Sequence, residues 1–299
     1  MARDGDLVAG IDIGGTKTHI LVGQGRTIIK DQIVPSADWR SWDRQKDMIA
    51  LSGLIREIAG RDLAAIAIGA HGCDADWQCK QWEADLGERL AGHITVVNDS
   101  ELLLPAAGYF SGIGVVSGTG SIAVARKTDG EMLVAGGWGW ILGDEGSAAA
   151  IVREAARAVR GSIDRGETGD PLVQALMAAL VTTDPTKIGR LLNDTRSAVV
   201  WGSYAGAVFD AAHEQSPLAL RVIEDGGRAL AKLVGILAAR GADRSNVVIG
   251  GGVIVEQPRL LAAFETAMAG VSPYSKITLL REPPVIGALA LAHHSLAGS

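Results

Sequence analysis

The chain has 299 residues, a length that predicts two domains rather than a single hydrophobic core. Its net charge is -6 and it has no run rich in Lys or Arg, which argues against nucleic acid and anionic membranes as partners. It has no long apolar stretch, its N-terminal residues do not resemble a signal peptide, and its two cysteines, Cys73 and Cys79, fit a reducing compartment as thiols. We therefore expect a cytoplasmic protein.

In chain order, the first part of the sequence predicts a three-stranded meander followed by alternating helices and strands. The three strands are expected at 7–13, 19–22 and 27–34. The elements that follow them are a helix, a strand, a helix, a strand and a short helix, at 42–59, 63–68, 82–90, 94–97 and 101–107.

The same order of elements begins again roughly a hundred residues further on. Strands are expected at 114–116, 122–126 and 132–135, and helices at 148–159, 171–181, 185–194, 197–213 and 217–240. The remaining elements are a strand, a helix, a strand and a helix, at 247–249, 258–268, 276–279 and 285–294. This repetition predicts a duplicated α/β fold with a ligand cleft between two domains. The expected domains are 1–108, joined by the C-terminal helix 284–299, and 109–283.

Two glycine-rich turns occupy equivalent places in the two halves, after the first strand of each. Glycines in such a turn let backbone N–H groups point at a phosphate, and threonine hydroxyls can bind it as well. The residues that we expect to bind the phosphates of ATP are Gly14, Gly15, Thr16, Lys17, Gly118, Thr119 and Gly120. Ordinary hairpin turns and a surface lysine are the alternatives. Asp12, at a strand end, is the expected ligand of the Mg²⁺ that accompanies ATP.

Two further strand ends carry candidate site residues. Gly250, Gly251 and Gly252 lie between a strand and a helix, where they would let adenosine lie on the backbone; close packing is the alternative. Asp99 follows the strand at 94–97, and such positions face the ligand cleft in α/β proteins. A kinase that acts on a hydroxyl needs a carboxylate to accept the proton, so Asp99 is the predicted base. The alternative is that Asp99 caps the following helix.

Together these motifs resemble those of the actin-like sugar kinase superfamily. Residues 136–147, Gly-Gly-Trp-Gly-Trp-Ile-Leu-Gly-Asp-Glu-Gly-Ser, resemble the signature of the N-acetylglucosamine kinase family. That family also contains ATPases that activate acyl-CoA dehydratases and benzoyl-CoA reductases. The resemblance covers nearly the whole chain and implies a duplicated ribonuclease H-like (actin-like ATPase) fold, with two domains around an ATP cleft. It further implies a homodimer that uses MgATP to phosphorylate glucosamine or N-acetylglucosamine at the 6-hydroxyl.

The resemblance also implies a set of residues that bind the sugar. They are Asp38, His71, Gly72, Asn98, Asp99, Gly137, Trp138 and Asp144. Asp144 matches the family position that holds sugar hydroxyls, while packing under the loop is the alternative for Trp138 and for Trp140. Asp38 stands where family members have an asparagine, and a carboxylate pairs with an ammonium better than an amide does. Asp38 therefore favours unacetylated glucosamine, unless it is a solvated loop residue; a structural role is the alternative for His71.

Three other functions stay open at this point: a kinase for another hexose, a regulatory ATPase, and an activator ATPase of the same family. The activators carry an iron–sulfur cluster that bridges a dimer, and Cys73 and Cys79 lack the surroundings expected of its ligands.

Overall fold

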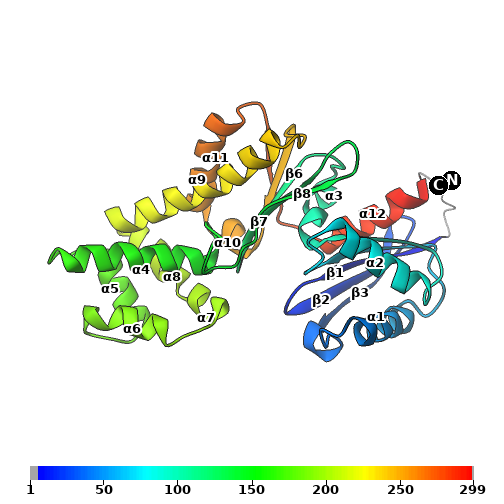
Figure 1. The fold of residues 1–299 in the computed structure, drawn as a ribbon, viewed down its shortest axis with the longest axis horizontal. Helices are drawn as coiled ribbons and strands as arrows, with labels where there is room; N and C mark the ends of the chain where they lie inside the picture. The colour runs from blue at the N-terminus through cyan, green and yellow to red at the C-terminus, as the bar shows by residue number, and fades with distance from the viewer. Residues whose placement is uncertain (1–5, 298–299) are drawn as a thin grey trace. The chain divides into compact units, whose positions relative to one another are not determined.

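The computed structural model describes residues 6–297, which divide into two compact units (Figure 1). Unit 1 contains the described residues up to 114, together with 125–132 and those from 280 onward. Unit 2 contains 115–124 and 133–279. The domain limits set from the sequence, 108/109 and 283/284, stay a prediction.

The first sheet lies in unit 1 and has the strand order β3-β2-β1-β4-β5. Its strands are β1 (Leu7–Ile13), β2 (Lys17–Gln24), β3 (Thr27–Pro35), β4 (Ala65–Ala70) and β5 (His93–Asn98). β2 runs antiparallel to β1 and β3, whereas β4 runs parallel to β1 and β5. The helices of unit 1 are η1 (Ser36–Asp38), α1 (Arg44–Ala59), α2 (Asp76–Gly87), η2 (Asp99–Leu102), α3 (Leu103–Ala106) and α12 (Val285–Ala297).

Strands β1 and β4, in the centre of this sheet, are apolar apart from Asp12 because both faces of the sheet are covered. On one face, Met48, Leu51 and Ile55 of α1 join a core cluster with residues of β1 and β4. On the other face α12 packs against β1 and β4 (Figure 1). A methyl group at Gly10 would lie 2.2 Å from the backbone nitrogen of Leu289, so a glycine is needed for this close approach.

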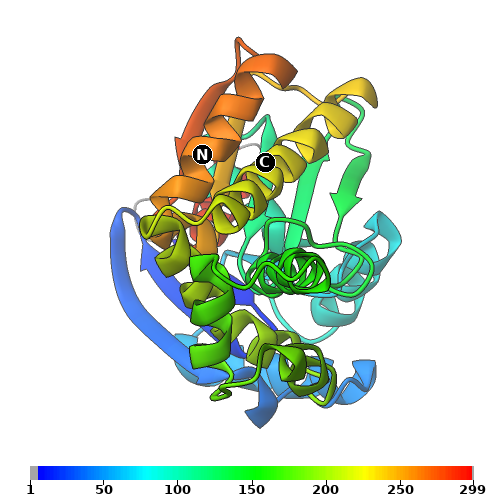
Figure 2. The ribbon, with the colours of Figure 1, turned by 90° about the vertical axis from the view of Figure 1, so that its left-hand side faces the viewer.

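The second sheet has the strand order β10-β9-β6-β7-β8. Its strands are β6 (Ile113–Ser117), β7 (Ser121–Arg126), β8 (Met132–Gly136), β9 (Asn246–Gly250) and β10 (Lys276–Leu279). The helices between these strands are α4 (Ala148–Asp164), α5 (Pro171–Ala179), η3 (Pro185–Lys187), α6 (Ile188–Asn193), α7 (Ala198–Ser203), α8 (Ala205–His213), α9 (Pro217–Ala239), α10 (Gly252–Glu256) and α11 (Pro258–Val271). α9 and α11 lie side by side (Figure 2).

Read from β8 to β10, the second sheet repeats the order of the first: third, second, first, fourth and fifth strand of each half. The predicted duplicated α/β fold is therefore confirmed. The helix expected at 197–213 is two helices, because the N–H of Tyr204 donates to the carbonyl of Trp201 and tightens the last turn of α7. The helix expected at 82–90 begins earlier, at Asp76, in a stretch whose few apolar residues hide its period. Within residues 6–297, no helix has both the length and the apolar character that crossing a membrane requires.

Candidate active site

The carboxyl ends of three parallel strands meet at one edge of the first sheet. Ile13 of β1 lies opposite Ala70 of β4, and Ala70 lies opposite Asn98 of β5. This register brings three predicted site residues, Asp12, His71 and Asp99, to the same edge. The Nδ1 atom of His71 lies 3.6 Å from Oδ2 of Asp99, and both side chains are partly exposed.

The charges at this edge influence one another. The pKa of the Asp12 carboxyl is raised to about 7, mainly by burial and also by the negative charge of Asp99, although the positive charge of Lys17 lowers it. The neighbouring carboxylate of Asp99 raises the pKa of His71, against the effect of burial. Asp99 is therefore the neighbour that favours the protonated form of His71.

Asn98, not Asp99, caps the helix that follows β5. Its Oδ1 accepts a hydrogen bond from the N–H of Ser100 at 2.9 Å, and Glu101 Oε1 accepts one from the N–H of Asn98 at 3.0 Å. The alternative interpretation of Asp99 as the cap is wrong, and its carboxylate is left to pair with His71. Asn98 itself, expected to contact the sugar, is buried, and its Nδ2 donates to the carbonyl of Cys73 and to Asp74 Oδ1.

The backbone carbonyls of the first glycine turn are held by hydrogen bonds from Ser36. Ser36 Oγ donates to the carbonyl of Gly14 at 2.9 Å, and the N–H of Ser36 donates to the carbonyl of Thr16 at the same distance. The turn nevertheless leaves Gly15, Thr16 and Lys17 exposed. Asp38 belongs to the short helix that begins at Ser36, so the predicted phosphate turn and the predicted sugar-binding aspartate are tied to one buried serine. Asp38 is itself exposed.

Arg40 lies at the same edge and was missed by the sequence analysis. Its Nη2 donates to the carbonyl of His71 at 2.8 Å, and its guanidinium stacks 4.1 Å above the ring of Trp42. Among the described residues, neither its Nε nor its Nη1 has a hydrogen-bond partner, although both are buried. Gly72, with φ of 87°, lies beside the Nη2 atom. The available signal was an arginine between two tryptophans, Trp39-Arg40-Ser41-Trp42.

In unit 2, the second glycine turn is bonded to the loop that carries Asp144. Ser117 Oγ donates to the carbonyl of Gly146 at 2.8 Å, and Ser121 Oγ donates to that of Glu145 at 2.9 Å. A methyl group at Gly120 would lie 2.9 Å from Asp144 Oδ2, so this turn and this carboxylate are neighbours. Thr119 is exposed at the tip of the turn.

Asp144 has the properties of a side chain arranged for a ligand. It is 8% exposed, and among residues 6–297 no group hydrogen-bonds its buried Oδ1 atom. Burial raises the pKa of its carboxyl, while hydrogen bonds from the backbone N–H groups of Gly139 and Ser121 lower it. An unpaired buried carboxylate oxygen is costly, and a hydroxyl donor of a ligand would satisfy it.

Gly250 ends β9, and the two glycines that follow it have different surroundings. A methyl group at Gly251 would lie 2.4 Å from the carbonyl oxygen of Ser117, so close packing explains this glycine. One at Gly252 would meet no atom within 4 Å. One at Gly118 would lie 3.7 Å from the backbone nitrogen of Gly252, so the second turn and the glycine triplet are adjacent.

Two tryptophans of the loop 136–147 have different environments. Trp138 is 76% exposed, whereas Trp140 packs against Trp201 with ring centroids 4.7 Å apart. Packing therefore explains Trp140. Gly137 precedes Trp138 with φ of 73°, and a methyl group there would lie 2.9 Å from Ile122 Cδ1.

The residues fit MgATP better than a metal ion held by protein alone. Among the described residues there is no group of three or more His, Cys, Asp or Glu side chains able to hold a metal. Mg²⁺ commonly binds one or two carboxylates and completes its shell with waters and substrate phosphates. Asp12, beside the exposed turn at Gly15 and Thr16, fits that arrangement.

Known proteins share this fold. The duplicated architecture is that of the actin-like ATPases. The chain belongs to the BadF/BadG/BcrA/BcrD ATPase family, whose model matches residues 9–292. The predicted family and fold class are thereby confirmed.

Two curated relatives are sugar kinases. An N-acetylmuramic acid/N-acetylglucosamine kinase of Clostridium acetobutylicum is 37% identical over 172 residues, which make up 54% of this chain. The match spans 56% of the length of that relative. An N-acetyl-D-glucosamine kinase of Dictyostelium discoideum is 23% identical over 316 residues, covering 97% of this chain and 98% of the relative. The predicted class, an ATP-dependent sugar kinase, agrees with these names.

Solved structures share the fold. A candidate N-acetylglucosamine kinase from Chromobacterium violaceum has a TM-score of 0.71 at 23% identity, covering 97% of this chain and 100% of that one. A ROK family glucokinase from Streptomyces griseus, solved with glucose and AMPPNP, has a TM-score of 0.58 at 18% identity, covering 96% and 99%.

Proposed function

We propose that this chain transfers the γ-phosphoryl group of MgATP to the 6-hydroxyl of an amino sugar, glucosamine or N-acetylglucosamine. The observation that carries the proposal is the strand register that brings Asp99 to the same sheet edge as Asp12, while Asn98 takes over the helix cap. Membership of an ATPase family and the names of the curated relatives support it further.

In the proposed reaction, Asp99 accepts the proton of the sugar hydroxyl. At the same time the hydroxyl oxygen of the sugar forms a bond to the γ-phosphorus, and the bond between the γ-phosphorus and the leaving ADP breaks. His71 lies beside this carboxylate, with its Nδ1 atom 3.6 Å from Oδ2 of Asp99. The proton leaves on Asp99, and the products are ADP and a sugar phosphate. When bound, Mg²⁺ supplies positive charge that offsets the charge of the phosphates, and Asp12 holds it directly or through water.

The remaining predicted residues bind the two substrates. The turns at Gly14–Lys17 and Gly118–Gly120 bind the phosphates of ATP through backbone N–H groups and hydroxyls, and Gly250–Gly252 receives the adenosine. The Oδ1 atom of Asp144 accepts a hydrogen bond from a sugar hydroxyl. Asp38, His71, Gly72, Gly137 and Trp138 complete the proposed sugar site. A homodimer in the cytoplasm is part of the same proposal, and sedimentation analysis tests the dimer.

Asp38 determines the proposed preference between the two amino sugars. An exposed carboxylate pairs with the ammonium of glucosamine and gains nothing from an acetamido group. We expect Asp38→Asn to lower kcat/KM for glucosamine and to leave that for N-acetylglucosamine unchanged. A wild-type protein that clearly prefers the acetylated sugar would contradict this preference.

The activator ATPases of the same family are the main rival. Their cluster needs cysteine ligands at a subunit surface, whereas Cys73 and Cys79 are 1% and 3% exposed and belong to the core of unit 1. This burial favours the kinase.

A sugar-dependent ADP-release assay tests the proposal. We would compare glucosamine, N-acetylglucosamine, N-acetylmuramic acid and glucose as acceptors, with Asp99→Asn beside the wild type. Removing the base should lower kcat by on the order of 10²- to 10⁴-fold and leave ATP binding intact. Asp129→Asn, which changes an exposed aspartate of a surface hairpin, is the matched control. Full turnover by Asp99→Asn would contradict the assignment of Asp99 as the base. ADP release that no sugar stimulates would contradict the proposal that this chain is a sugar kinase.

A further inference from the structure

Asp144 is held in a backbone conformation that needs external support. Its φ is 57°, in the left-handed region that non-glycine residues avoid, and Gly139 and Gly146 of the same loop have φ of 79° and 84°. Such a conformation is energetically unfavourable and persists where surrounding contacts hold it in place. Ser117 and Ser121 hold one side of the loop through the carbonyls of Gly146 and Glu145.

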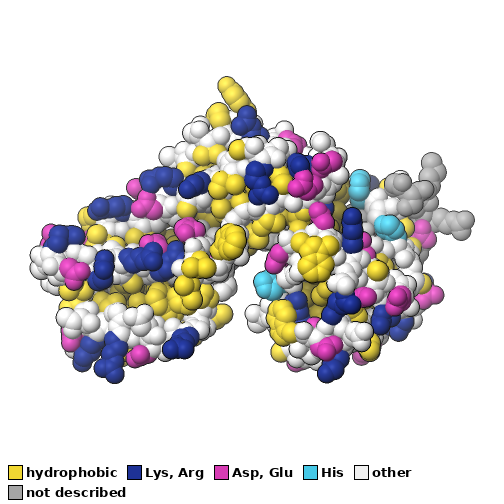
Figure 3. Space-filling view, in the orientation of Figure 1, with side chains coloured by type: hydrophobic (Ala, Val, Ile, Leu, Met, Phe, Trp, Pro, Cys, Tyr) yellow, Lys and Arg dark blue, Asp and Glu magenta, His cyan; other side chains and the backbone are white. Residues whose placement is uncertain are grey.

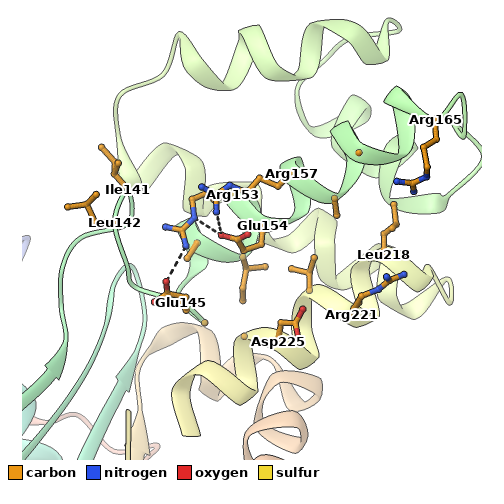
Figure 4. Close-up of a pocket in the computed structure, with 17 residues that line it drawn as sticks. Ile141, Leu142, Glu145, Arg153, Glu154, Arg157, Arg165, Leu218, Arg221 and Asp225 are labelled. Atoms are coloured by element: carbon orange, nitrogen blue, oxygen red, sulfur yellow. Dashed lines mark hydrogen bonds and ion pairs between the residues drawn. The ribbon is translucent and has the colours of Figure 1, made fainter. Parts of the chain in front are cut away.

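Arg153, on α4, holds the other side. Its Nη1 donates to the carbonyl of Gly143 at 2.8 Å and also to the carbonyl of Trp140. Its Nη2 lies 3.8 Å from Glu145 Oε1, and its Nε donates to Glu154 Oε1 at 2.7 Å (Figure 4). Arg153 is only 8% exposed and its bond to the carbonyl of Gly143 is buried, so this bond forms away from water, where it is stronger. The carboxylates of Glu145 and Glu154 are partly exposed.

These contacts differ from those of the neighbouring cations. Lys and Arg side chains gather along α4 and α9 (Figure 3), and several line a cavity of about 710 Å³ next to the loop. Arg157, one turn beyond Arg153, is 63% exposed and pairs with Glu154 (Figure 4). Of Arg153 and Arg157, it is Arg153 that hydrogen-bonds the backbone of the loop. Its two carbonyl partners, at Trp140 and Gly143, flank residues 141 and 142, and the second of them directly precedes Asp144.

We propose that Arg153 is a positioning residue: it fixes the loop Gly139–Gly146 in the one conformation that presents the free Oδ1 atom of Asp144 to the acceptor sugar. The inference rests on the proposed role of Asp144 in binding the sugar. The planar guanidinium matches two carbonyls and two carboxylates at once, which the single ammonium of a lysine cannot do. Loss of these bonds would release the left-handed turn, and Asp144 would leave its position.

Hydrogen exchange of the protein without ligands tests the structural half. We expect Arg153→Gln and Arg153→Lys to speed exchange of the amides in 137–147, and Arg157→Gln, the matched control, to leave it unchanged. Arg153→Lys keeps the charge and the bulk, so it keeps the test valid if Arg153→Gln folds poorly. Loop exchange equal to that of the wild type in a folded Arg153 variant would overturn the inference, whatever the protein phosphorylates.

Steady-state kinetics test the functional half. Because a displacement of about 1 Å can cost on the order of 10²-fold, we expect kcat/KM for the sugar to fall by that order in Arg153→Lys while the KM for ATP stays unchanged. Equal changes in the constants for sugar and ATP would indicate a general structural role and overturn the inference. A wild-type protein with a protected loop and no sugar-dependent turnover would instead overturn the proposed function, and with it the role of Arg153 toward the sugar.

Discussion

Gly251→Ala should destabilise the protein strongly, because Gly251 is held where an alanine does not fit. Its φ and ψ are 111° and 157°, in a region essentially reserved for glycine, which costs another residue about 1–3 kcal/mol. The new methyl group would also lie 2.4 Å from the carbonyl oxygen and 2.7 Å from the carbonyl carbon of Ser117, and this backbone lies in the middle of the second sheet. Overpacking adds about 1–3 kcal/mol.

The two effects together give a loss of about 2–6 kcal/mol in the free energy of unfolding. For a structure of this size, that corresponds to a fall in Tm of about 2–4 °C for each kcal/mol. Urea unfolding and thermal melting, both followed by circular dichroism, measure the loss.

Gly252→Ala is the matched control, since the added methyl group would meet no atom within 4 Å and Gly252 begins a helix. We expect its stability to stay within about 0.5 kcal/mol of the wild type. If adenosine lies on this residue, as proposed, the same variant should bind ATP more weakly. A Gly251→Ala protein with wild-type stability, or a Gly252→Ala protein that is equally destabilised, would show that neither the φ of Gly251 nor its contact with Ser117 requires a glycine.

Three further predictions concern charged groups of unit 1. The pKa of Asp12 is about 7 in the folded protein, mainly because of burial, and 3.8 in the unfolded chain. As the pH rises above 3.8, the folded protein therefore loses stability relative to the unfolded chain, in which Asp12 ionises more easily. Asp12→Asn should therefore raise the Tm of the metal-free protein at about pH 8 and change it little at about pH 4; equal effects at both would contradict this. The pKa of His71 should fall in Asp99→Asn, measured by NMR titration, because the neighbouring carboxylate of Asp99 is the main cause of its raised value; an unchanged pKa would show that the pair does not form. Arg126→Met should cost about 3–5 kcal/mol in urea unfolding, since it leaves the buried carboxylate of Glu101 without its ion pair; a cost below about 1 kcal/mol would contradict a desolvated pair.

Much of the fold was predictable because its signals are local. Short apolar runs ending in glycine turns mark the strands, and their recurrence in the same order predicts the duplication. The break at Tyr204 was not predictable, because it depends on one tightened hydrogen bond within a continuous apolar period. The start of α2 was hidden by a polar first turn, whose Asp76 pairs with the distant Arg126.

The site was predictable only in part, because some of its residues act through contacts between distant segments of the chain. Asp12 lies next to the last residue of β1 and Asp99 directly follows β5, positions that are visible in the sequence. Arg40 and Arg153 were missed because their partners are backbone carbonyls, which carry no sequence signature, in segments that only folding brings near. The role of Gly251 likewise depends on Ser117, far away in the chain.

Phosphoryl transfer itself is best tested by measuring ADP and sugar 6-phosphate in the same reaction of wild-type protein, MgATP and an amino sugar, with mass spectrometry and NMR to identify the product. We expect equal amounts of the two products from the wild type, and loss of both in Asp99→Asn. ADP formed without any phosphorylated sugar would contradict the proposed phosphoryl transfer.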